Sequence, residues 1–172
     1  MVSDIKIRPM QASDIGQILA IQAACYTEIE PESCASLLAK HTASPATCFV
    51  AELGGGGQVA GYLLSVPCEL ANPPALNAPN CPLPAAPDCL YLHDLAIAPA
   101  GRGAGVGKML VQAFMGALQA SALHSASLIA IQGSAPYWMR FGFAPAPLTP
   151  PLAAKLQTYG QGAQYLRLVR MK

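Results

Sequence analysis

The residues whose types and spacing most clearly suggest chemistry lie at positions 101–108, which read GRGAGVGK. Four of these eight residues are glycine, and the last is lysine. The segment follows a strand-like run and precedes a helix-like run, so the first amides of a helix are left without intrahelical partners. Such amides attract anions, and glycine lets the backbone approach a ligand closely. The segment therefore predicts a loop that binds phosphate groups.

Two common phosphate loops do not fit this spacing. A Walker A loop requires glycine five residues before its Gly-Lys pair and Ser or Thr after it, whereas Arg102 and Met109 occupy those positions. A dinucleotide fingerprint requires G-x-G-x-x-G, and its third glycine is replaced by Val106 or Lys108, depending on the starting residue. The pattern that fits is Arg-x-x-Gly-x-Gly, beginning at Arg102.

Hydrophobic periodicity predicts the elements that must position this loop. The strand-like segments are 5–8, 47–53, 58–66, 89–98, 127–131, a segment from 143 onward, and 164–171. The helix-like segments follow Ser13 and Asp14, cover 31–40, begin again near 105, and cover 135–141. This order contains a parallel strand–helix–strand crossover. The sequence therefore predicts an α/β (α+β) fold with a mixed sheet.

Residues 67–88 interrupt this pattern, because they hold seven of the sixteen prolines and almost no charge. Proline removes backbone donors and disfavours regular sheet, so the segment is expected to be an irregular loop. A loop of this length within a domain is either functional or a low-complexity insertion. The sequence leaves both interpretations open.

Composition limits the class of protein. The chain of 172 residues is 53% hydrophobic and 11% charged, with a net charge of +1, which is typical of one globular domain over residues 1–172. Its basic residues are scattered, which argues against a nucleic-acid-binding surface. Residues 109–139 lack Asp, Glu, Lys and Arg, but their period changes midway. That change favours a buried helix and strand over a membrane span.

The N-terminus and the cysteines bear on the compartment. The first ten residues, MVSDIKIRPM, lack the apolar stretch of an export signal. None of the six cysteines belongs to a CxxC pair, which argues against zinc, so no metal site is expected. We therefore expect reduced thiols and a cytoplasmic protein.

Three segments in order resemble the GNAT superfamily of N-acetyltransferases. YLHDLAIAPAGRGAGVGKMLVQAF resembles the family's central strand, loop and helix, FVAELGGGGQVAGYLLSV its preceding hairpin, and YWMRFGF its closing helix-to-strand segment. The resemblance covers residues 5–143. It implies a mixed central sheet of about six to seven strands flanked by about four helices. It also implies acetyl-CoA as the co-substrate.

The resemblance assigns a coenzyme A site to the loop and to the strand before it. In the family the loop amides bind the pyrophosphate, and the strand backbone pairs with the pantetheine arm. The corresponding residues are Leu95, Ala96, Ile97, Arg102, Gly103, Ala104, Gly105, Val106, Gly107 and Lys108. An amide near Leu95 is the expected oxyanion donor. Core packing is the alternative role for the side chains of Leu95 and Ile97.

A general base is needed to deprotonate an amine acceptor, and His93 and Asp94 are the candidates. Adjacent side chains on a strand point to opposite faces. If Leu95 and Ile97 mark the cofactor face, His93 shares it and Asp94 points away, which favours His93. A β-bulge would exchange the faces, so Asp94 is the second candidate. A hydrogen-bonded core histidine is the alternative role for His93.

The general acid is expected at Tyr137. The family usually has tyrosine four residues before the glycine of its Gly-Phe pair, but here Trp138 occupies that position before Gly142. Either Tyr137 serves from a shifted helix, or the thiolate leaves without a side-chain acid. Gln132 or Ser134 is expected to replace the asparagine that is common in the preceding segment.

These assignments predict transfer of an acetyl group from acetyl-CoA to a primary amine of a small molecule or peptide, with general-base assistance. The alternatives are a non-catalytic acyl-CoA-binding sensor and an interaction module that has lost the cofactor. We expect neither nucleic acid nor a membrane as a partner, and a homodimer stays open. The low charge of the segments expected around the acceptor favours a neutral or apolar amine.

Overall fold

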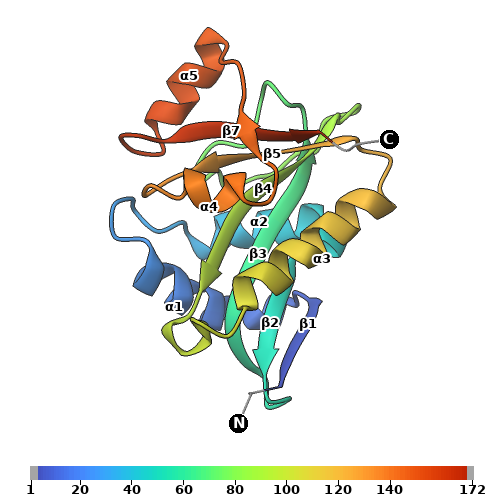
Figure 1. Ribbon diagram of the computed structural model, residues 1–172, viewed down its shortest axis with the longest axis vertical. Helices are drawn as coiled ribbons and strands as arrows, with labels where there is room; N and C mark the ends of the chain where they lie inside the picture. Colours follow the sequence, from blue (N-terminus) through green and yellow to red (C-terminus); the bar gives the residue numbers. More distant parts are fainter. Residues whose placement is uncertain (1–3, 170–172) are drawn as a thin grey trace.

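The computed structural model describes residues 4–169. Their strands form one sheet in the order β1-β2-β3-β4-β5-β7-β6 (Figure 1). Neighbouring strands are antiparallel except β4 and β5, which are parallel and are connected through α3. The strands are β1 (Ile5–Pro9), β2 (Phe49–Leu53), β3 (Gln58–Cys68), β4 (Cys89–Ile97), β5 (Ser125–Ala130), β6 (Ala144–Pro145) and β7 (Gln164–Val169). The helices are α1 (Ile15–Cys25), α2 (Cys34–Ala43), α3 (Val106–Ala120), α4 (Ala135–Met139) and α5 (Pro150–Gln157).

Helices cover both faces of the sheet because its strands alternate between two apolar sets of side chains. Phe114 of α3 packs in one cluster with Leu63 of β3. Ile18 of α1 and Leu37 of α2 pack in another cluster with Leu64, the next residue of β3. A third cluster joins α5 and β7 to β3 and β4. Among residues 4–169, no helix combines the length and the apolar character needed to cross a membrane.

A β-bulge in β4 decides the orientation of its side chains. Leu64 of β3 pairs with Asp94, but the next residue, Ser65, pairs with Leu92. His93 is therefore an extra residue without a partner across the ladder. A bulge of this kind shifts the alternation of side chains and increases the local twist of the strand.

The sheet splits just after this bulge. Pairing between β4 and β5 ends at Leu92 and Leu128. β4 nevertheless continues to Ile97, and β5 continues to Ala130. One edge of β4 between residues 93 and 97 therefore has no neighbouring strand within the described part of the chain.

Two helices differ from the sequence-based expectation. α2 begins at Cys34 rather than Pro31, because the Ser33 side chain accepts a hydrogen bond from the Ser36 amide and caps the helix there. α5 was not expected, although Thr149 caps it in the same way and proline occupies its first turn. Both helix starts carry signals that the hydrophobic period alone does not reveal.

The proline-rich loop is shorter than expected, because β3 extends through Cys68, and it covers residues 69–88. Apart from one bridge between Glu69 and Asn72, it contains neither strand nor helix. Side chains of α5 and of the residues after it form hydrogen bonds with this loop. The Tyr159 hydroxyl donates to the Pro74 carbonyl at 3.0 Å, and Lys155 Nζ donates to Asn72 Oδ1 at 2.8 Å.

Candidate active site

The glycine-rich loop ends in an uncapped helix N-terminus. Gly105, with a φ of 79°, immediately precedes α3 in the left-handed conformation that favours glycine. The Met109 amide donates to the Gly105 carbonyl at 3.1 Å, which is the first backbone bond of the helix. The amides of Val106, Gly107 and Lys108 come before that bond, and no side chain caps the helix. This end of α3 is therefore available to an anion.

The loop, the end of β4 and α4 enclose a groove of about 620 Å³. The charged residues that line it are Arg102, Lys108 and Arg140, and among the described residues no acidic side chain lines it. All the residues assigned to the cofactor from sequence line this groove except Ala96, which is buried toward α1, and Ala104, which is exposed. The sequence analysis did not identify Arg140, which lies in the turn after α4.

The open edge of β4 directs backbone groups into the split of the sheet. The backbone amide of Ala98 donates to the Ala60 carbonyl of β3 at 2.7 Å. Backbone groups alternate along a strand, so the amides and carbonyls of Leu95 and Ile97 point away from β3. Their carbonyls accept hydrogen bonds from the Tyr26 hydroxyl, at 2.8 Å, and from Cys25 Sγ, at 3.2 Å. The amides of Leu95 and Ile97 therefore point toward the edge that borders the groove.

A second cavity of about 220 Å³ adjoins the groove, and Leu95 and Tyr137 line both. The Tyr137 hydroxyl lies beside Gly107 at the start of α3. A Cβ added to Gly107 would be only 2.7 Å from this hydroxyl. Burial raises the pKa of Tyr137 above its usual value. Trp138 instead packs in the core with 6% of its surface exposed. These positions favour Tyr137 over Trp138 as the residue that reaches a ligand.

Asp94 lines the smaller cavity, and each of its two carboxylate oxygens already accepts a hydrogen bond. Its carboxylate accepts from the Tyr26 hydroxyl at 2.5 Å and from the Tyr62 hydroxyl at 2.6 Å. Burial raises the pKa of Asp94, although both hydroxyl donors act in the opposite direction. Removing either tyrosine hydroxyl would therefore leave a buried carboxyl oxygen without that hydrogen bond.

His93 forms a buried pair with Glu32, which lies between α1 and α2. His93 Nε2 is 2.8 Å from Glu32 Oε2, and the His93 side chain is 1% exposed. His93 Nδ1 is buried and has no hydrogen-bond partner. An ionised carboxylate only accepts hydrogen bonds, so the network assigns the proton of a neutral ring to Nε2. Nδ1 is then the nitrogen with a free lone pair.

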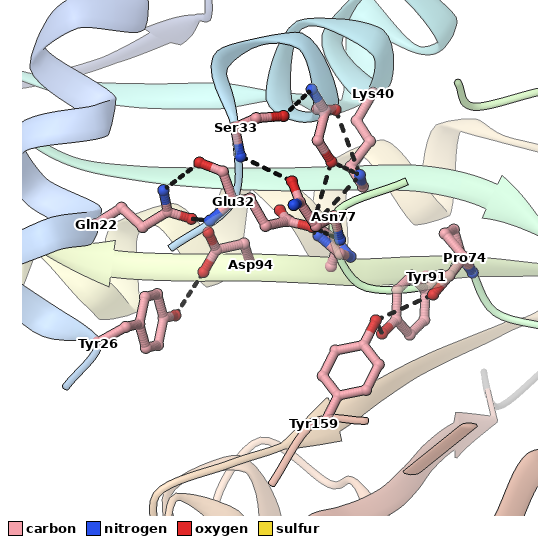
Figure 2. Close-up of polar contacts among 12 residues, drawn as sticks. Gln22, Tyr26, Glu32, Ser33, Lys40, Pro74, Asn77, Tyr91, Asp94 and Tyr159 are labelled. Carbon is pink, nitrogen blue, oxygen red and sulfur yellow. Dashed lines mark hydrogen bonds and ion pairs between the residues drawn. The ribbon is translucent and has the colours of Figure 1, made fainter. Parts of the chain in front are cut away.

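Glu32 is the centre of a polar network around β4 (Figure 2). Its Oε1 accepts from the Asn77 amide at 2.6 Å and lies 3.6 Å from Nζ of Lys40, a fully buried lysine that also donates to Ser36. The Glu32 backbone is held by Gln22, whose amide side chain exchanges two hydrogen bonds with it at 3.1 Å. The position of the carboxylate is therefore fixed from several sides.

The charge of Glu32 follows from these contacts. Burial raises the pKa of Glu32, but the neighbouring His93 and Lys40 and the Asn77 amide more than offset it, so the pKa is lowered from 4.5 to about 2. Glu32 is thus an anion at neutral pH. Glu32, His93 and Lys40 are three ionisable groups that lie together in a buried site. The charge of each one therefore affects the stability of the other two.

The expectation that His93 shares the face of Leu95 and Ile97 is wrong. Because of the bulge, His93 and Asp94 both point toward the side of the sheet covered by α1 and α2, where His93 contacts Glu32. Leu95 and Ile97 pack against the α3 cluster on the other side. Both candidate bases therefore line one cavity.

Sequence reasoning missed Glu32, Lys40 and Asn77 altogether. Glu32 and His93 are 61 residues apart in the chain, and Glu32 and Asn77 are 45 apart. No local motif links them, since each contact depends on how α2 and the proline-rich loop fold over β4. A glutamate that follows two others, Glu28 and Glu30, and precedes a serine-capped helix is otherwise read as an ordinary exposed residue.

The fold and site define a class of α/β proteins in which an anionic ligand binds in the split of a mixed sheet, at a helix N-terminus. Residues 15–143 match the model of the acetyltransferase (GNAT) family, and the chain belongs to this family. The resemblance seen in the sequence is thereby confirmed. No curated protein sequence matches the chain.

Solved structures with the same fold extend over nearly the whole chain. Ard1 from Thermoplasma volcanium is 17% identical with a TM-score of 0.73, and the match covers 98% of this chain and 99% of that one. The ribosomal-protein-S18-alanine N-acetyltransferase from Escherichia coli is 14% identical, with a TM-score of 0.68 and coverage of 98% and 96%. These likenesses confirm the expected mixed fold, with five α helices in place of about four.

A third structure contains ligands. It is N-acetylglutamate synthase from Neisseria gonorrhoeae complexed with coenzyme A and N-acetyl-glutamate, 15% identical with a TM-score of 0.70. The match covers 98% of this chain but 36% of that one. Together with membership in the family, it supports the expectation that the co-substrate carries coenzyme A.

Proposed function

We propose that this chain transfers an acetyl group from acetyl-CoA to a primary amine by direct attack. The observation that carries the proposal is the contrast between two adjoining cavities. The groove is lined by three cations and a helix N-terminus, whereas the smaller cavity is lined by Glu32, His93 and Asp94. Phosphate groups and an ammonium group need these opposite electrostatic environments.

The residues of the groove fit acetyl-CoA. A Cβ added at Gly103 or Gly105 would meet no atom within 4 Å, so the backbone there borders open space. The amides at the start of α3 would hold the diphosphate, with Arg102 and Lys108 adding positive charge. The amides of Leu95 and Ile97 would pair with the extended arm. When bound, the thioester supplies an acetyl group that is already activated for transfer.

His93 is the general base in this proposal. The Asp94 carboxylate is engaged by two hydroxyl donors, whereas His93 Nδ1 has no partner. Glu32 holds the ring through Nε2 and stabilises the positive charge that the ring acquires on taking the proton from the amine. Because the side chain is 1% exposed, the proton reaches Nδ1 through one water molecule or after a small shift of the ring. Asp94 is the second candidate.

Two groups at the junction of the cavities complete the reaction. The Leu95 amide would donate to the acetyl oxygen as negative charge develops there. The amine nitrogen forms a bond to the acetyl carbon while the carbon–sulfur bond breaks. Tyr137 would then donate its hydroxyl proton to the departing sulfur, which its position beside Gly107 supports.

Thiol release measures the proposed function directly. We expect free coenzyme A to appear in equal amounts with acetylated amine when acetyl-CoA and a panel of primary amines are supplied. Binding of acetyl-CoA without thiol release on any amine would instead favour the acyl-CoA-binding sensor. Absence of any thermal shift with acetyl-CoA would favour an interaction module, since a ligand at 100 times its Kd stabilises by about 2.7 kcal/mol.

Replacing Gly105 with alanine should weaken acetyl-CoA binding. The φ of 79° at this position costs a residue with a side chain about 1–2 kcal/mol, and the added methyl group enters the groove. We expect the Kd for acetyl-CoA, measured by calorimetry, to rise by about tenfold or more. Gly116→Ala in the same helix is the matched control, because it has open space around it and no positive φ. Equal Kd values for both variants would contradict the assignment of the loop.

Tyr137→Phe tests the general acid. Removing the hydroxyl should lower kcat by about 10²-fold, the low end for acid–base groups, because thiolate is already a good leaving group. The Kd for acetyl-CoA should change little, since the ring keeps its contacts with Trp138 and Phe141. An unchanged kcat would show that the thiolate leaves without a side-chain acid.

A further inference from the structure

The smaller cavity is built to hold a compact apolar group. Its volume of about 220 Å³ lies below the roughly 300–1,000 Å³ of pockets that hold drug-sized ligands. Four apolar side chains from four separate segments form one part of its wall, namely Ile29, Leu76, Ile131 and Trp138, beside polar side chains such as Gln132 and Ser134. An acceptor that fills this space gains most from burying apolar surface.

The ionisable side chains around the cavity are acidic, apart from His93 and the tyrosines. Glu32, His93 and Asp94 line it, and among the described residues neither lysine nor arginine does. Lys40 does not line the cavity and is held by Ser36 and Glu32. A carboxylate or phosphate on the acceptor would therefore meet two acidic groups without a cation to pair with.

The proline-rich loop supplies one wall of the cavity. Leu76 lines it, and the residues on both sides of Leu76 are anchored. The Asn77 amide donates to Glu32, and the Pro74 carbonyl accepts from the Tyr159 hydroxyl at 3.0 Å. Leu76 is thus held between two fixed points, one of which is the carboxylate that orients His93.

We propose that the acceptor is a small primary amine whose other atoms carry no charge, and that residues 69–88 set this selectivity through Leu76. The inference rests on the proposed acetyl transfer and specifies its second substrate. The acidic groups attract the ammonium form of the amine, and the apolar wall takes up the rest of the molecule. A carboxylate elsewhere on the acceptor loses both advantages, and a second ammonium group loses the contact with the apolar wall.

Matched amines test the inference. Phenethylamine and phenylalanine differ by one carboxylate, as do isopentylamine and leucine. We expect kcat/KM to favour the member of each pair that lacks the carboxylate by about 100-fold or more, because like charges placed together cost several kcal/mol. The carboxylate-bearing amines are the more easily deprotonated, so amine basicity does not explain this preference. Equal or reversed preference, or equally fast acetylation of a tripeptide amide, would overturn the inference.

Leu76→Arg should change this preference. The added guanidinium would face the cavity and pair with the acceptor carboxylate, so the ratio of kcat/KM for phenethylamine over phenylalanine should fall by about tenfold or more. Leu76→Gln, which adds polarity without charge, is the control and should leave the ratio within about threefold of wild type. A similar fall in both variants would mean that the loop does not act through charge.

The single tryptophan separates failure of this inference from failure of the proposed function. Trp138 is the only tryptophan in the chain and lines the cavity, so its fluorescence should report acceptor binding without turnover. If no amine is acetylated but phenethylamine changes the fluorescence at lower concentration than phenylalanine does, acetyl transfer is wrong and the selectivity stands. If acetylation proceeds while phenylalanine binds equally well, acetyl transfer stands and the selectivity is wrong.

Discussion

His93→Gln is expected to lower kcat by about 10²–10⁴-fold, the range for loss of a general base. The glutamine amide retains a donor for Glu32 but has no lone pair that matches Nδ1 and gains no proton at neutral pH. The Kd for acetyl-CoA should stay within about twofold, because His93 lies outside the groove at the helix N-terminus. Steady-state kinetics and calorimetry on the same variant give both values.

Two further measurements define the base. Long-range proton–nitrogen NMR spectra should show neutral His93 as the Nε2–H form. The chain has only three histidines, so these spectra contain few signals to assign. Glu32→Gln should reduce kcat as well, because the new amide can donate to Nε2 and place the ring proton on Nδ1. Full activity of His93→Gln together with a large loss in Asp94→Asn would assign the base to Asp94 instead.

Lys40→Met is expected to lower the free energy of unfolding by about 3–5 kcal/mol, the usual loss when a buried ion pair loses one partner. Methionine fills a similar volume, so the loss reports the charge rather than a cavity. Lys40 is fully buried, and its Nζ lies 3.6 Å from Glu32 Oε1. Urea unfolding monitored by circular dichroism measures the change.

A double variant distinguishes charge pairing from packing. Lys40→Met combined with Glu32→Gln should be more stable than Lys40→Met alone, since the buried carboxylate that lost the lysine charge is gone. Additive losses in the double variant would show that the two side chains act independently. Lys40→Met should also leave acetyl-CoA binding unchanged, because Lys40 does not line the groove.

The contacts of Glu32 with His93, Lys40 and Asn77 predict how stability depends on pH. The pKa of Glu32 is lowered from 4.5 to about 2, so the folded state binds the proton less well than the unfolded chain. The Glu32 contribution to stability is therefore fully present above about pH 4.5 and is lost as the pH falls toward 2. Glu32→Gln should flatten the stability curve in this window. An unchanged slope between these pH values would contradict the pairing.

Much of the cofactor side was predictable because its signals are local. A strand, a turn rich in glycine and an apolar helix period lie within about thirty consecutive residues, and each is set by backbone and side-chain preferences of neighbours. Gly105 could be assigned to a turn before a helix from its type alone. The groove that the structure forms there contains most of the residues expected in it.

The acceptor side was predicted in outline only. Strand alternation gave the wrong face for His93, because one extra residue in β4 shifts the period and no residue type signals it. Asp94 does point away from the face of Leu95 and Ile97, as expected. Trp138 matched the family position for an acid, yet the structure buries it and leaves Tyr137 at the junction. In both cases a shift of one position along the chain changes which side chain faces the cavity, and packing decides that shift.

The sequence by itself determined the order of the strands along the chain, the mixed α/β class and the glycine-rich turn at which α3 begins. Each of these depends on residues close together in the chain, whose preferences add without regard to the rest of the molecule. Only the tertiary structure decided that both candidate bases line one cavity, what orients His93 and how large that cavity is. The orientation of His93 depends on Glu32, which Lys40 and Asn77 contact in turn. Contacts such as that between Glu32 and His93, which are 61 residues apart in the chain, form only when the whole core packs.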